Sequence, residues 1–544
     1  MKKNSLLVLF ILVACISLSS TAQVNRPKIV VGLVIDQMRW DYLYRYSDLY
    51  GNDGFKRLLK DGFSAENTFV PYIPTVTGAG HTCIYTGSVP AIHGIVANDW
   101  VDRETGVLMY CAKDTTVMPV GSMSVAIGQM SPRNMLTNTI GDELRLATNF
   151  RSKVIGISLK DRGGILPAGH SANAAYWFDD LTGKWITSTY YTNELPVWVQ
   201  AYNNRKVPDS LMANDWNLLY DKSKYIQSTD DDEPYEKILE SDKSRVFPHR
   251  YQSIIGSKNY NVFRASPYGT TYSFDFAEQI INNEQMGMGT ETDMLCLSVS
   301  STDYIGHRFG PNSLEIEDTY LRLDRELADF LHFLDKRFGK NNYTVFLTAD
   351  HGAPQISAFL KEKKYFTAGS LNSGALLKNI NSFCKRRLGI DSAAKKIYDY
   401  DLYLNHKTIE ASGVSEKKVK DLIVEYLKTL PEVWNAFDMD DMNTIPMPEV
   451  LRQKMNNSYY FRRSGDIQYF YKPQYTDYTV DGLEHGVWYP YDTHIPCVFY
   501  GWGIKAGKTN RETYMTDIAP TITALLKIQM PSGCVGKVIT EAIK

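Results

Sequence analysis

Three apolar, β-branched runs, at residues 28–35, 294–299 and 343–348, end abruptly in acidic or histidine-containing turns, and residues 494–500 form a further such run. Unbroken apolar runs of this length are typical of strands that are buried on both faces. The pattern therefore predicts a mainly parallel sheet that is covered by helices.

The stretch after residue 312 has the apolar spacing of an amphipathic helix, with apolar side chains at Ile316, Tyr320, Leu323, Leu327, Leu331 and Leu334. Asn312 and Glu315 stand at capping-box distance, and Gly339 is a suitable stop. Strands that alternate with such helices predict an α/β fold, a doubly wound and mainly parallel sheet with helices on both faces. Ligands collect at the carboxyl ends of the strands in such sheets, which is where the acidic turns fall.

Two long stretches separate the strand-end turns, at roughly residues 170–290 and 360–480. Both are rich in Tyr, Asn, Asp and Lys and poor in long apolar runs. We expect them to be insertions that build a cap around the cleft of one α/β domain spanning residues 23–544.

The first 22 residues have the pattern of a secretory signal peptide. Lys2 and Lys3 precede an apolar run at residues 6–16, and small residues at 20–22 offer a cleavage site. The run is too short for a lasting membrane span, so we expect an exported, periplasmic protein. Residues 12–15 (Leu-Val-Ala-Cys) resemble a lipobox, which makes lipoprotein anchoring at Cys15 the alternative.

The composition is that of an ordinary globular protein, with 44% hydrophobic residues, 22% charged residues and a formal net charge of -2. This balance gives no overall attraction to nucleic acid or to anionic lipid. Six cysteines follow the signal peptide, an even number that permits disulfides in an oxidising compartment, with buried free thiols as the alternative. The sequence does not fix the oligomeric state, and we take a monomer as the expectation.

Six residues at the strand ends have side chains that bind transition-metal dications: Asp36, Asp303, His307, Asp350, His351 and His485. Mixed carboxylate and imidazole ligands suit zinc, and two sets of three would leave each ion an open position for substrate. A single aspartate after a strand is common, but the pairing of Asp-His-Gly at 350–352 with Asp-x-x-x-His at 303–307 is much more specific. We therefore expect a site for two Zn²⁺ ions.

Residues 74–81 (Pro-Thr-Val-Thr-Gly-Ala-Gly-His) form a glycine-rich segment that leads into a predicted helix. A hydroxyl at a helix N-terminus meets the positive end of the helix dipole, which favours an alkoxide and a nearby phosphate. Metal coordination is the usual way to deprotonate an alcohol without a histidine base. Thr77 is therefore a candidate nucleophile, although this segment alone would be interpreted as an ordinary helix cap.

Lys160 and Arg162 form a third candidate element. Side chains two positions apart can converge on one anion, and the arginine offers a planar fork to two phosphoryl oxygens. By itself, a Lys-Asp-Arg triplet is usually a solvated surface turn.

Taken in chain order, these motifs resemble those of the alkaline phosphatase superfamily over nearly the whole mature chain. The matching residues are Asp36, Pro74-Thr75-x-Thr77, Thr86-Gly87, His93-Gly94, Asn98, Asp303-x-x-x-His307, Asp350-His351-Gly352 and His485-Gly486. Residues 158–170 are similar to the phosphate-irrepressible periplasmic alkaline phosphatases, which have a threonine nucleophile. That stretch is absent from the related nucleotide pyrophosphatase/phosphodiesterases.

The resemblance implies a role for each matching residue. Thr77 is the nucleophile, and Asn98, Lys160 and Arg162 contact non-bridging phosphoryl oxygens. One zinc ion is held by Asp36, Asp350 and His351, and the other by Asp303, His307 and His485. His494 also lies in the family's C-terminal motif, but His485 heads a His-Gly pair like that of the family and is the preferred sixth ligand.

We therefore expect an enzyme that hydrolyses small phosphate monoesters through a phospho-threonine intermediate and releases inorganic phosphate. A monoester carries more charge on its non-bridging oxygens than a diester, so Lys160 and Arg162 favour monoesters. A phosphodiesterase or nucleotide pyrophosphatase with the same metal ions is the main alternative. The sequence lacks the Cys/Ser-x-Pro-x-Arg motif of the sulfatases, which makes a sulfatase less favoured. An export signal does not fit a phosphoglycerate mutase. A non-catalytic binding protein would not need Thr77 and all six ligands.

Overall fold

The computed structural model of the chain describes residues 25–257, 259–477 and 481–544. Its largest sheet has ten strands in the order β20-β2-β19-β11-β1-β10-β7-β8-β9-β6, of which the outer strands are β20 (Gly507–Thr509), β2 (Phe63–Ala65) and β6 (Pro119–Val120). The predicted signal peptide and Cys15 lie outside the described residues. Within the described part of the chain, no helix has both the length and the apolar character needed to cross a bilayer.

Five neighbouring strands at the centre of this sheet run parallel: β11 (Tyr343–Thr348), β1 (Ile29–Ile35), β10 (Asp293–Val299), β7 (Val154–Ser158) and β8 (Ala174–Asp179). Every residue of these strands is buried, which is why three of them appear in the sequence as unbroken apolar runs. The predicted mainly parallel α/β sheet is confirmed.

The strand next to this centre on each side runs antiparallel to it. On one side β19 (Cys497–Gly501) pairs antiparallel with β11, and on the other β9 (Lys184–Ser188) pairs antiparallel with β8. The apolar run predicted at 494–500 is divided, because β18 (His494–Ile495) belongs to a separate three-stranded sheet. Pro496 stands between the two strands and has no backbone N–H to donate to a ladder.

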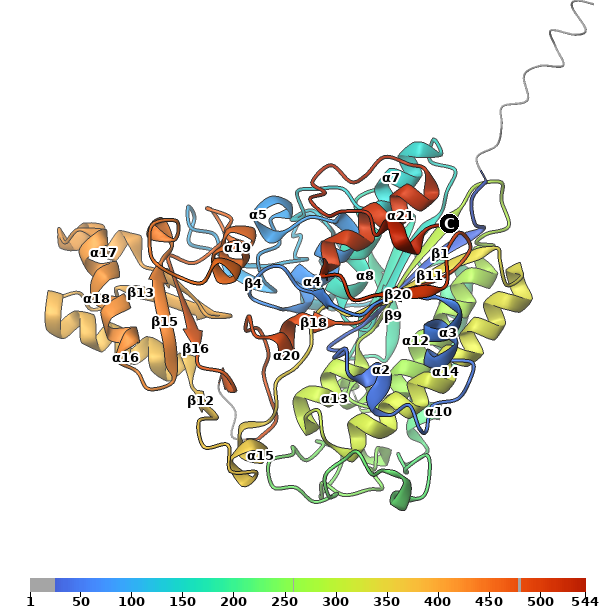
Figure 1. The fold of residues 1–544 in the computed structure, drawn as a ribbon, viewed down its shortest axis with the longest axis horizontal. Helices are drawn as coiled ribbons and strands as arrows, with labels where there is room; N and C mark the ends of the chain where they lie inside the picture. Colours follow the sequence, from blue (N-terminus) through green and yellow to red (C-terminus); the bar gives the residue numbers. More distant parts are fainter. Residues whose placement is uncertain (1–24, 258, 478–480) are drawn as a thin grey trace, which may run out of the picture.

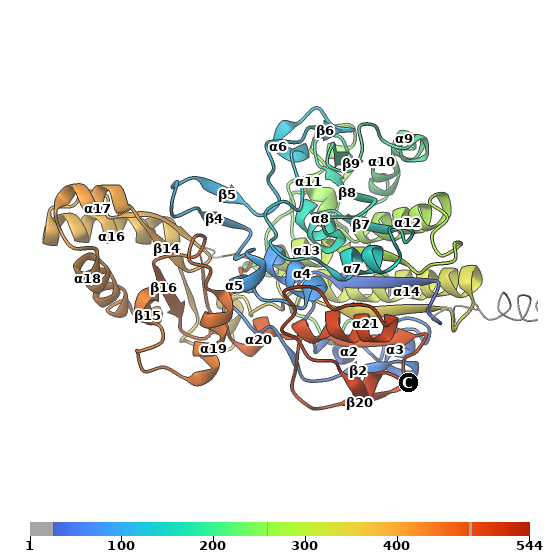
Figure 2. The same ribbon diagram turned by 90° about the horizontal axis from the view of Figure 1, so that it is seen from above.

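Helices cover both faces of the sheet (Figures 1 and 2). One face carries α12 (Pro267–Asn283) and α14 (Leu314–Phe338), and the other carries α4 (Thr77–Thr86), α7 (Ile140–Ala147), α8 (Asp161–Ala168) and α21 (Ile518–Leu526). The predicted helix at 312–339 is α14, and it ends at Gly339 as expected. Its cap is Ser313 rather than Asn312, because the Ser313 hydroxyl accepts from the Ile316 N–H, whereas Asn312 bonds to Gln355 and Arg45.

The first of the two expected insertions, roughly 170–290, contributes directly to the main sheet. It supplies β8 and β9 and then α12 on one face. β8 (Ala-Ala-Tyr-Trp-Phe-Asp) is largely aromatic, and β9 (Lys-Trp-Ile-Thr-Ser) has polar residues at both ends, so neither gives an unbroken β-branched run that stands out in the sequence. The core of the fold therefore extends into this segment.

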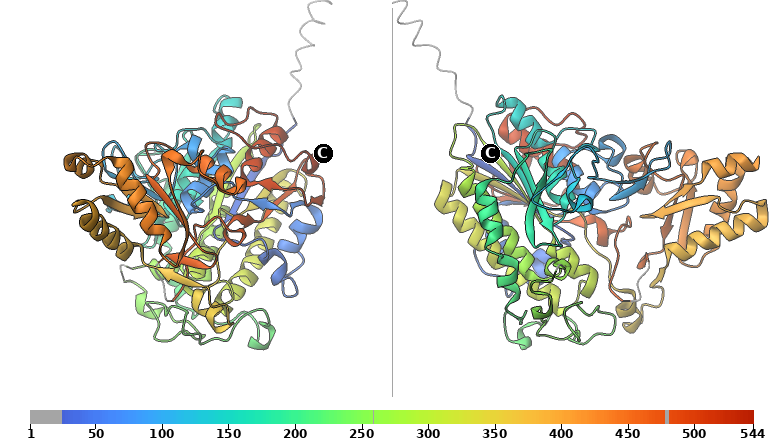
Figure 3. Two further views of the ribbon diagram at one scale, coloured as in Figure 1. Left: turned by 60° about the vertical axis from the view of Figure 1, so that its left-hand side comes forward. Right: turned by 180° about the vertical axis from the view of Figure 1, so that it is seen from behind.

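The second expected insertion, roughly 360–480, contains a separate lobe, which we call the cap lobe (residues 372–471). It has a four-stranded sheet of β13 (Ala394–Tyr398), β14 (Asp401–Leu404), β16 (Ile467–Tyr471) and β15 (Val433–Asp438). Its helices are α16 (Ser373–Leu388), α17 (His406–Ser412), α18 (Glu416–Lys428) and α19 (Glu449–Ser458). The lobe has its own apolar core and projects from the main sheet (Figure 3, right).

All six cysteines of the described chain are free, and five are buried: Cys83, Cys111, Cys296, Cys384 and Cys497, with Cys534 half-buried. Of the two possibilities open for the cysteines, the structure has free thiols.

Candidate active site

The three predicted carboxylate ligands meet at the carboxyl edge of three adjacent strands. Asp36 follows β1, Asp350 follows β11, and Asp303 lies in the first turn of α13 (Ser301–Phe309), which follows β10. Because β11, β1 and β10 are neighbours in the sheet, their ends place the three side chains together. All three are buried, with exposed fractions of 2% or less.

Asp36, Asp350 and His351 form the first compact group of potential ligands, each offering one atom within 4.8 Å of the others. His351 Nε2 lies 3.6 Å from Asp36 Oδ1 and 3.4 Å from Asp350 Oδ2. These three atoms are buried and have no hydrogen-bond partner among the described residues. Buried polar atoms are normally satisfied, so this set fits a metal ion that would take all three.

Asp303, His351 and His485 form a second compact group. His485 Nε2 lies 3.6 Å from Asp303 Oδ1, and His307 Nε2 lies 3.2 Å from the same oxygen. The rings of His351 and His485 stack with centroids 3.6 Å apart. His307, predicted as the third member of this set, thus lies beside the group, while His351 stands between both groups.

The three histidines are held by backbone carbonyls in a form suited to ligation. The Nδ1 atoms of His307, His351 and His485 lie 2.8, 2.9 and 2.7 Å from the carbonyl oxygens of Leu483, Gly352 and Thr75. A carbonyl only accepts, so each Nδ1 carries a proton, which leaves each Nε2 as the ring atom available to a metal ion. This is the usual support of metal-bound histidines.

The charges of the site follow from burial and from close neighbours. Burial and Asp350 raise the pKa of Asp36, whereas burial and the neighbouring His351 and His307 lower the pKa of His485 well below its ordinary value. His485 is therefore a neutral imidazole, the form that binds metal. Burial lowers the pKa of His307, but Asp303 and Glu484 outweigh it and raise the value to about 9.

Lys160 occupies the centre of the site. Its Nζ donates to Asp36 Oδ2 at 2.7 Å, to Asp303 Oδ2 at 2.6 Å and to Thr77 Oγ1 at 3.2 Å. The side chain is buried, and the two carboxylates keep its pKa above the ordinary value despite that burial. The predicted phosphate contact thus also bridges both ligand groups and touches the candidate nucleophile.

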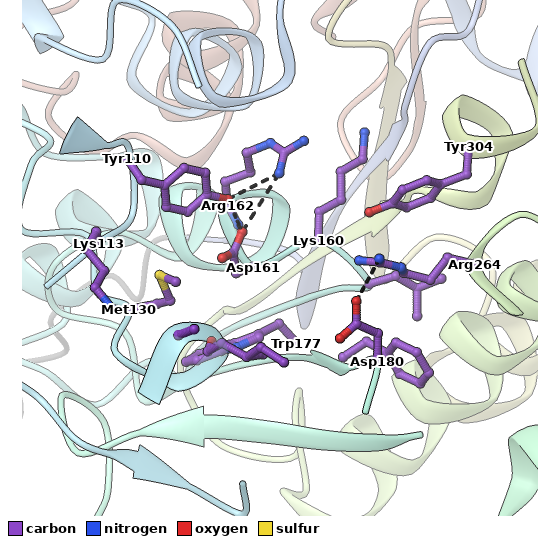
Figure 4. A pocket seen from close by; sticks show the side chains of 14 residues that line it. Tyr110, Lys113, Met130, Lys160, Asp161, Arg162, Trp177, Asp180, Arg264 and Tyr304 are labelled. Atoms are coloured by element: carbon purple, nitrogen blue, oxygen red, sulfur yellow. Dashed lines mark hydrogen bonds and ion pairs between the residues drawn. The ribbon is translucent and has the colours of Figure 1, made fainter. Parts of the chain in front are cut away.

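Thr77 is the first residue of α4, whose ten residues are all buried. The Asn98 side chain is tied to the same helix start, because its Oδ1 accepts from the Gly78 N–H at 2.8 Å. Arg162 stands in the first turn of α8, and its Nη1 donates to the Tyr110 hydroxyl at 3.2 Å. Figure 4 shows Lys160 and Arg162 extending in the same direction from the start of α8.

His494, the alternative sixth ligand, lies outside both groups. Its Nε2 pairs with the Glu66 carbonyl at 2.9 Å, and its ring stacks on Trp40 with centroids 4.7 Å apart. His485 is therefore the histidine of the C-terminal segment that joins the candidate ligands.

Two further residues support the site and were not singled out as ligands or catalytic residues from the sequence. Gln37 has a left-handed φ of 64°, its Nε2 donates to Asp303 Oδ1 at 2.7 Å, and its backbone N–H donates to Asp350 Oδ1 at 3.1 Å. His81 pairs through Nε2 with Ser298 Oγ at 2.8 Å, and its Nδ1 lies 3.0 Å from the Thr77 carbonyl. The signal in the sequence that could have identified these two residues is their position, since each lies within four residues of a predicted site residue.

The sequence profile of the type I phosphodiesterase/nucleotide pyrophosphatase family matches residues 30–491. The chain belongs to this family. Its fold is that of the alkaline phosphatase superfamily, as the sequence motifs predicted.

Two similar proteins and one crystal structure resemble the chain over nearly its whole length. It is 49% identical to a protein of Myroides odoratus named calcium-transporting ATPase, over 96% of each chain. It is 48% identical to alkaline phosphatase PafA of Elizabethkingia meningoseptica, over 99% of each chain. A crystal structure of alkaline phosphatase PafA matches with a TM-score of 0.94 and 49% identity, covering 96% of this chain and all of that one. The chain is an enzyme of the phosphatase class.

Proposed function

We propose that the enzyme hydrolyses phosphate monoesters with Thr77 as the nucleophile at a site for two zinc ions. The observation that carries this proposal is the convergence of three buried carboxylates and three histidine Nε2 atoms on the start of α4. Asp36, Asp350 and His351 would hold one ion, and Asp303, His307 and His485 the other. Bound dications would supply the positive charge that acidifies an alcohol and stabilises phosphoryl oxygens.

The residues of the chain prepare both the nucleophile and its target. Lys160 donates to Thr77 Oγ1 and so favours its deprotonated form, and the N-terminus of α4 adds the positive end of the helix dipole. Asn98, Lys160 and Arg162 orient the phosphoryl group for in-line attack, which is most of what a loose phosphoryl-transfer transition state needs. Thr77 Oγ1 forms a bond to phosphorus as the ester P–O bond breaks and the alcohol leaves, and water then hydrolyses the phospho-threonine to inorganic phosphate and restores the Thr77 hydroxyl.

The Thr77 claim is tested by replacing the hydroxyl and keeping the helix. Thr77→Ala should lower kcat/KM for an aryl monoester by about a thousandfold or more, because the nucleophile is lost. Thr86→Ala is a matched control, since that hydroxyl lies at the other end of α4 and, among the described residues, bonds to its own helix and to Ser88. Acid-quenched wild type should yield a phosphorylated Thr77 peptide. Wild-type turnover in Thr77→Ala would refute the assignment.

The choice of monoesters rests on Lys160 and Arg162, because a monoester presents more negative charge to them than a diester does. Arg162→Ala should therefore lower kcat/KM for an aryl monoester far more than for its diester. An equal loss on both substrates would mean that Arg162 does not detect the additional charge. The family description makes a phosphodiesterase or nucleotide pyrophosphatase the second candidate, and a wild-type preference for the diester would establish it.

We further propose that the enzyme is exported to the periplasm through residues 1–22 and acts as a monomer. Mass spectrometry of the mature N-terminus separates cleavage after Ala22 from lipid attachment at Cys15.

ATP belongs among the substrates to be tested, because one relative is named as an ATPase.

A further inference from the structure

A cavity opens beside the candidate catalytic residues, at the carboxyl ends of β7 and β8. It has a volume of about 420 Å³ and shares Lys160 and Arg162 with the phosphoryl site (Figure 4). Much of its wall is apolar or aromatic: Ile127, Met130, Leu159, Trp177 and Phe178. This size and this lining are typical of sites that bind small organic molecules.

The charged side chains that line the cavity are mostly cationic: Lys113, Lys160, Arg162 and Arg264, against Asp161 and Asp180. Lys160 already faces Asp36 and Asp303, so its charge belongs to the ligand groups. The three remaining cations exceed the two carboxylates by one charge. The cavity therefore favours an anion.

Arg264 is a cation of this cavity that lies outside the ligand groups. Its Nη2 donates to Asp180 Oδ2 at 2.8 Å and to Asn261, and its guanidinium carbon lies 4.8 Å from the centroid of the Tyr304 ring. Its Nε is buried and has no hydrogen-bond partner among the described residues. The guanidinium is thus fixed in position while its hydrogen-bonding capacity is only partly used.

Arg162 also lines this cavity, and its hydrogen-bond donors are likewise only partly used. Its Nε is also buried without a partner in the described chain, and its Nη1 lies 3.2 Å from the Tyr110 hydroxyl and 4.0 Å from Asp161 Oδ1. Two arginines with unsatisfied donors, together with an aromatic wall, point to a ligand that combines negative charge with an apolar body.

We propose that this cavity is a binding subsite for a carboxylate- or phosphate-bearing aromatic group, anchored by Arg264. The aromatic body packs on the apolar wall, and Arg264 and Lys113 take the negative charge. Such a group reaches the cavity either as a substituent of the substrate or as a free anion. In the first case the subsite rests on the proposed monoesterase function, because it adjoins the phosphoryl site through Arg162.

Calorimetric titration of the metal-loaded enzyme with terephthalate tests the free-anion source. Wild type should bind the dianion, and the neutral terephthalamide should bind more weakly. Arg264→Met should weaken terephthalate binding by about tenfold, because one charge-assisted contact is lost. Arg308→Met is the matched control, since Arg308 pairs with Glu240 at 2.8 Å and does not line the cavity.

Lys113→Met provides a second variant in case Arg264→Met fails to fold. Within the described part of the chain its Nζ makes one hydrogen bond, an exposed one to the Val125 carbonyl, so its replacement leaves the core intact. This variant should also weaken terephthalate binding while keeping the wild-type unfolding midpoint.

The substrate source is tested by comparing phenyl phosphate with 4-carboxyphenyl phosphate. If the substituent enters the cavity, Arg264→Met should lower kcat/KM about tenfold for the carboxylated ester and leave phenyl phosphate within about twofold. An unchanged ratio with weakened terephthalate binding would assign the cavity to a free anion. Unchanged values in both experiments would overturn the subsite. Binding needs no turnover, so failure of the monoesterase proposal would appear separately, as lost hydrolysis with intact binding.

Discussion

Gly80→Ala should damage the active site, although Gly80 is not itself a predicted catalytic or metal-binding residue. Gly80 lies in α4, three residues after Thr77, where the helix passes the end of β11. A Cβ at this position would lie 2.6 Å from Asp350 Cβ and 2.7 Å from the Asp350 carbonyl oxygen. Carbon atoms pack at about 3.5–4.0 Å, so the two elements would have to separate by about 1 Å.

That separation falls between the nucleophile and a metal ligand. A misplacement of about 1 Å in an oriented site can lower the rate about a hundredfold, and overpacking of a rigid core destabilises by about 1–3 kcal/mol. We therefore expect kcat/KM for an aryl monoester to fall by about two orders of magnitude, with a measurable drop in the unfolding midpoint.

Gly289→Ala is the matched control for this experiment. A Cβ at Gly289 would meet nothing within 4 Å. The control should keep wild-type activity and should be neutral or slightly stabilising, because alanine has less freedom in the unfolded chain. Wild-type kinetics in Gly80→Ala would show that the close approach of α4 to β11 does not position Thr77.

Two further predictions concern stability. Chelation should lower the unfolding midpoint, and added zinc should restore it, because the buried atoms Asp36 Oδ1, Asp350 Oδ2 and His351 Nε2 have no hydrogen-bond partner among the described residues, and each unsatisfied atom costs about 1–3 kcal/mol. An unchanged midpoint in calorimetry would contradict the ligand group. His406 in the cap lobe has its pKa raised by Asp466 and Glu416 from 6.5 to about 9. Its stabilising contribution is therefore complete below pH 6.5 and lost as the pH rises through 9, so the midpoints of wild type and His406→Gln should converge above that pH.

The sequence was sufficient to locate the candidate ligands that follow buried strands. Asp36 and Asp350 each come directly after an unbroken apolar run, and parallel neighbours bring such positions to one edge. His307 follows from its spacing to Asp303, since residues four apart share a helix face. Each of these predictions depends on local pattern alone.

Other features depend on contacts that have no local pattern. Gln37 bonds to Asp303 and Asp350 across distant parts of the chain, and only the folded sheet brings these together. Lys160 was expected to contact phosphate, but its place between two ligand carboxylates follows from the neighbouring ends of β7, β10 and β1. The strands β8 and β9 were missed because aromatic burial in short strands does not give a continuous apolar run.

The cap lobe stands in the chain between two candidate ligands, His351 and His485, whose rings stack at the site. The chain leaves and returns beside the short parallel pair β12 (Gly369–Leu371) and β17 (Tyr475–Asp477). An ion held by His485 together with Asp303 and His307 would join the two ends of this long excursion, so its binding free energy would stabilise the closed loop in the folded state.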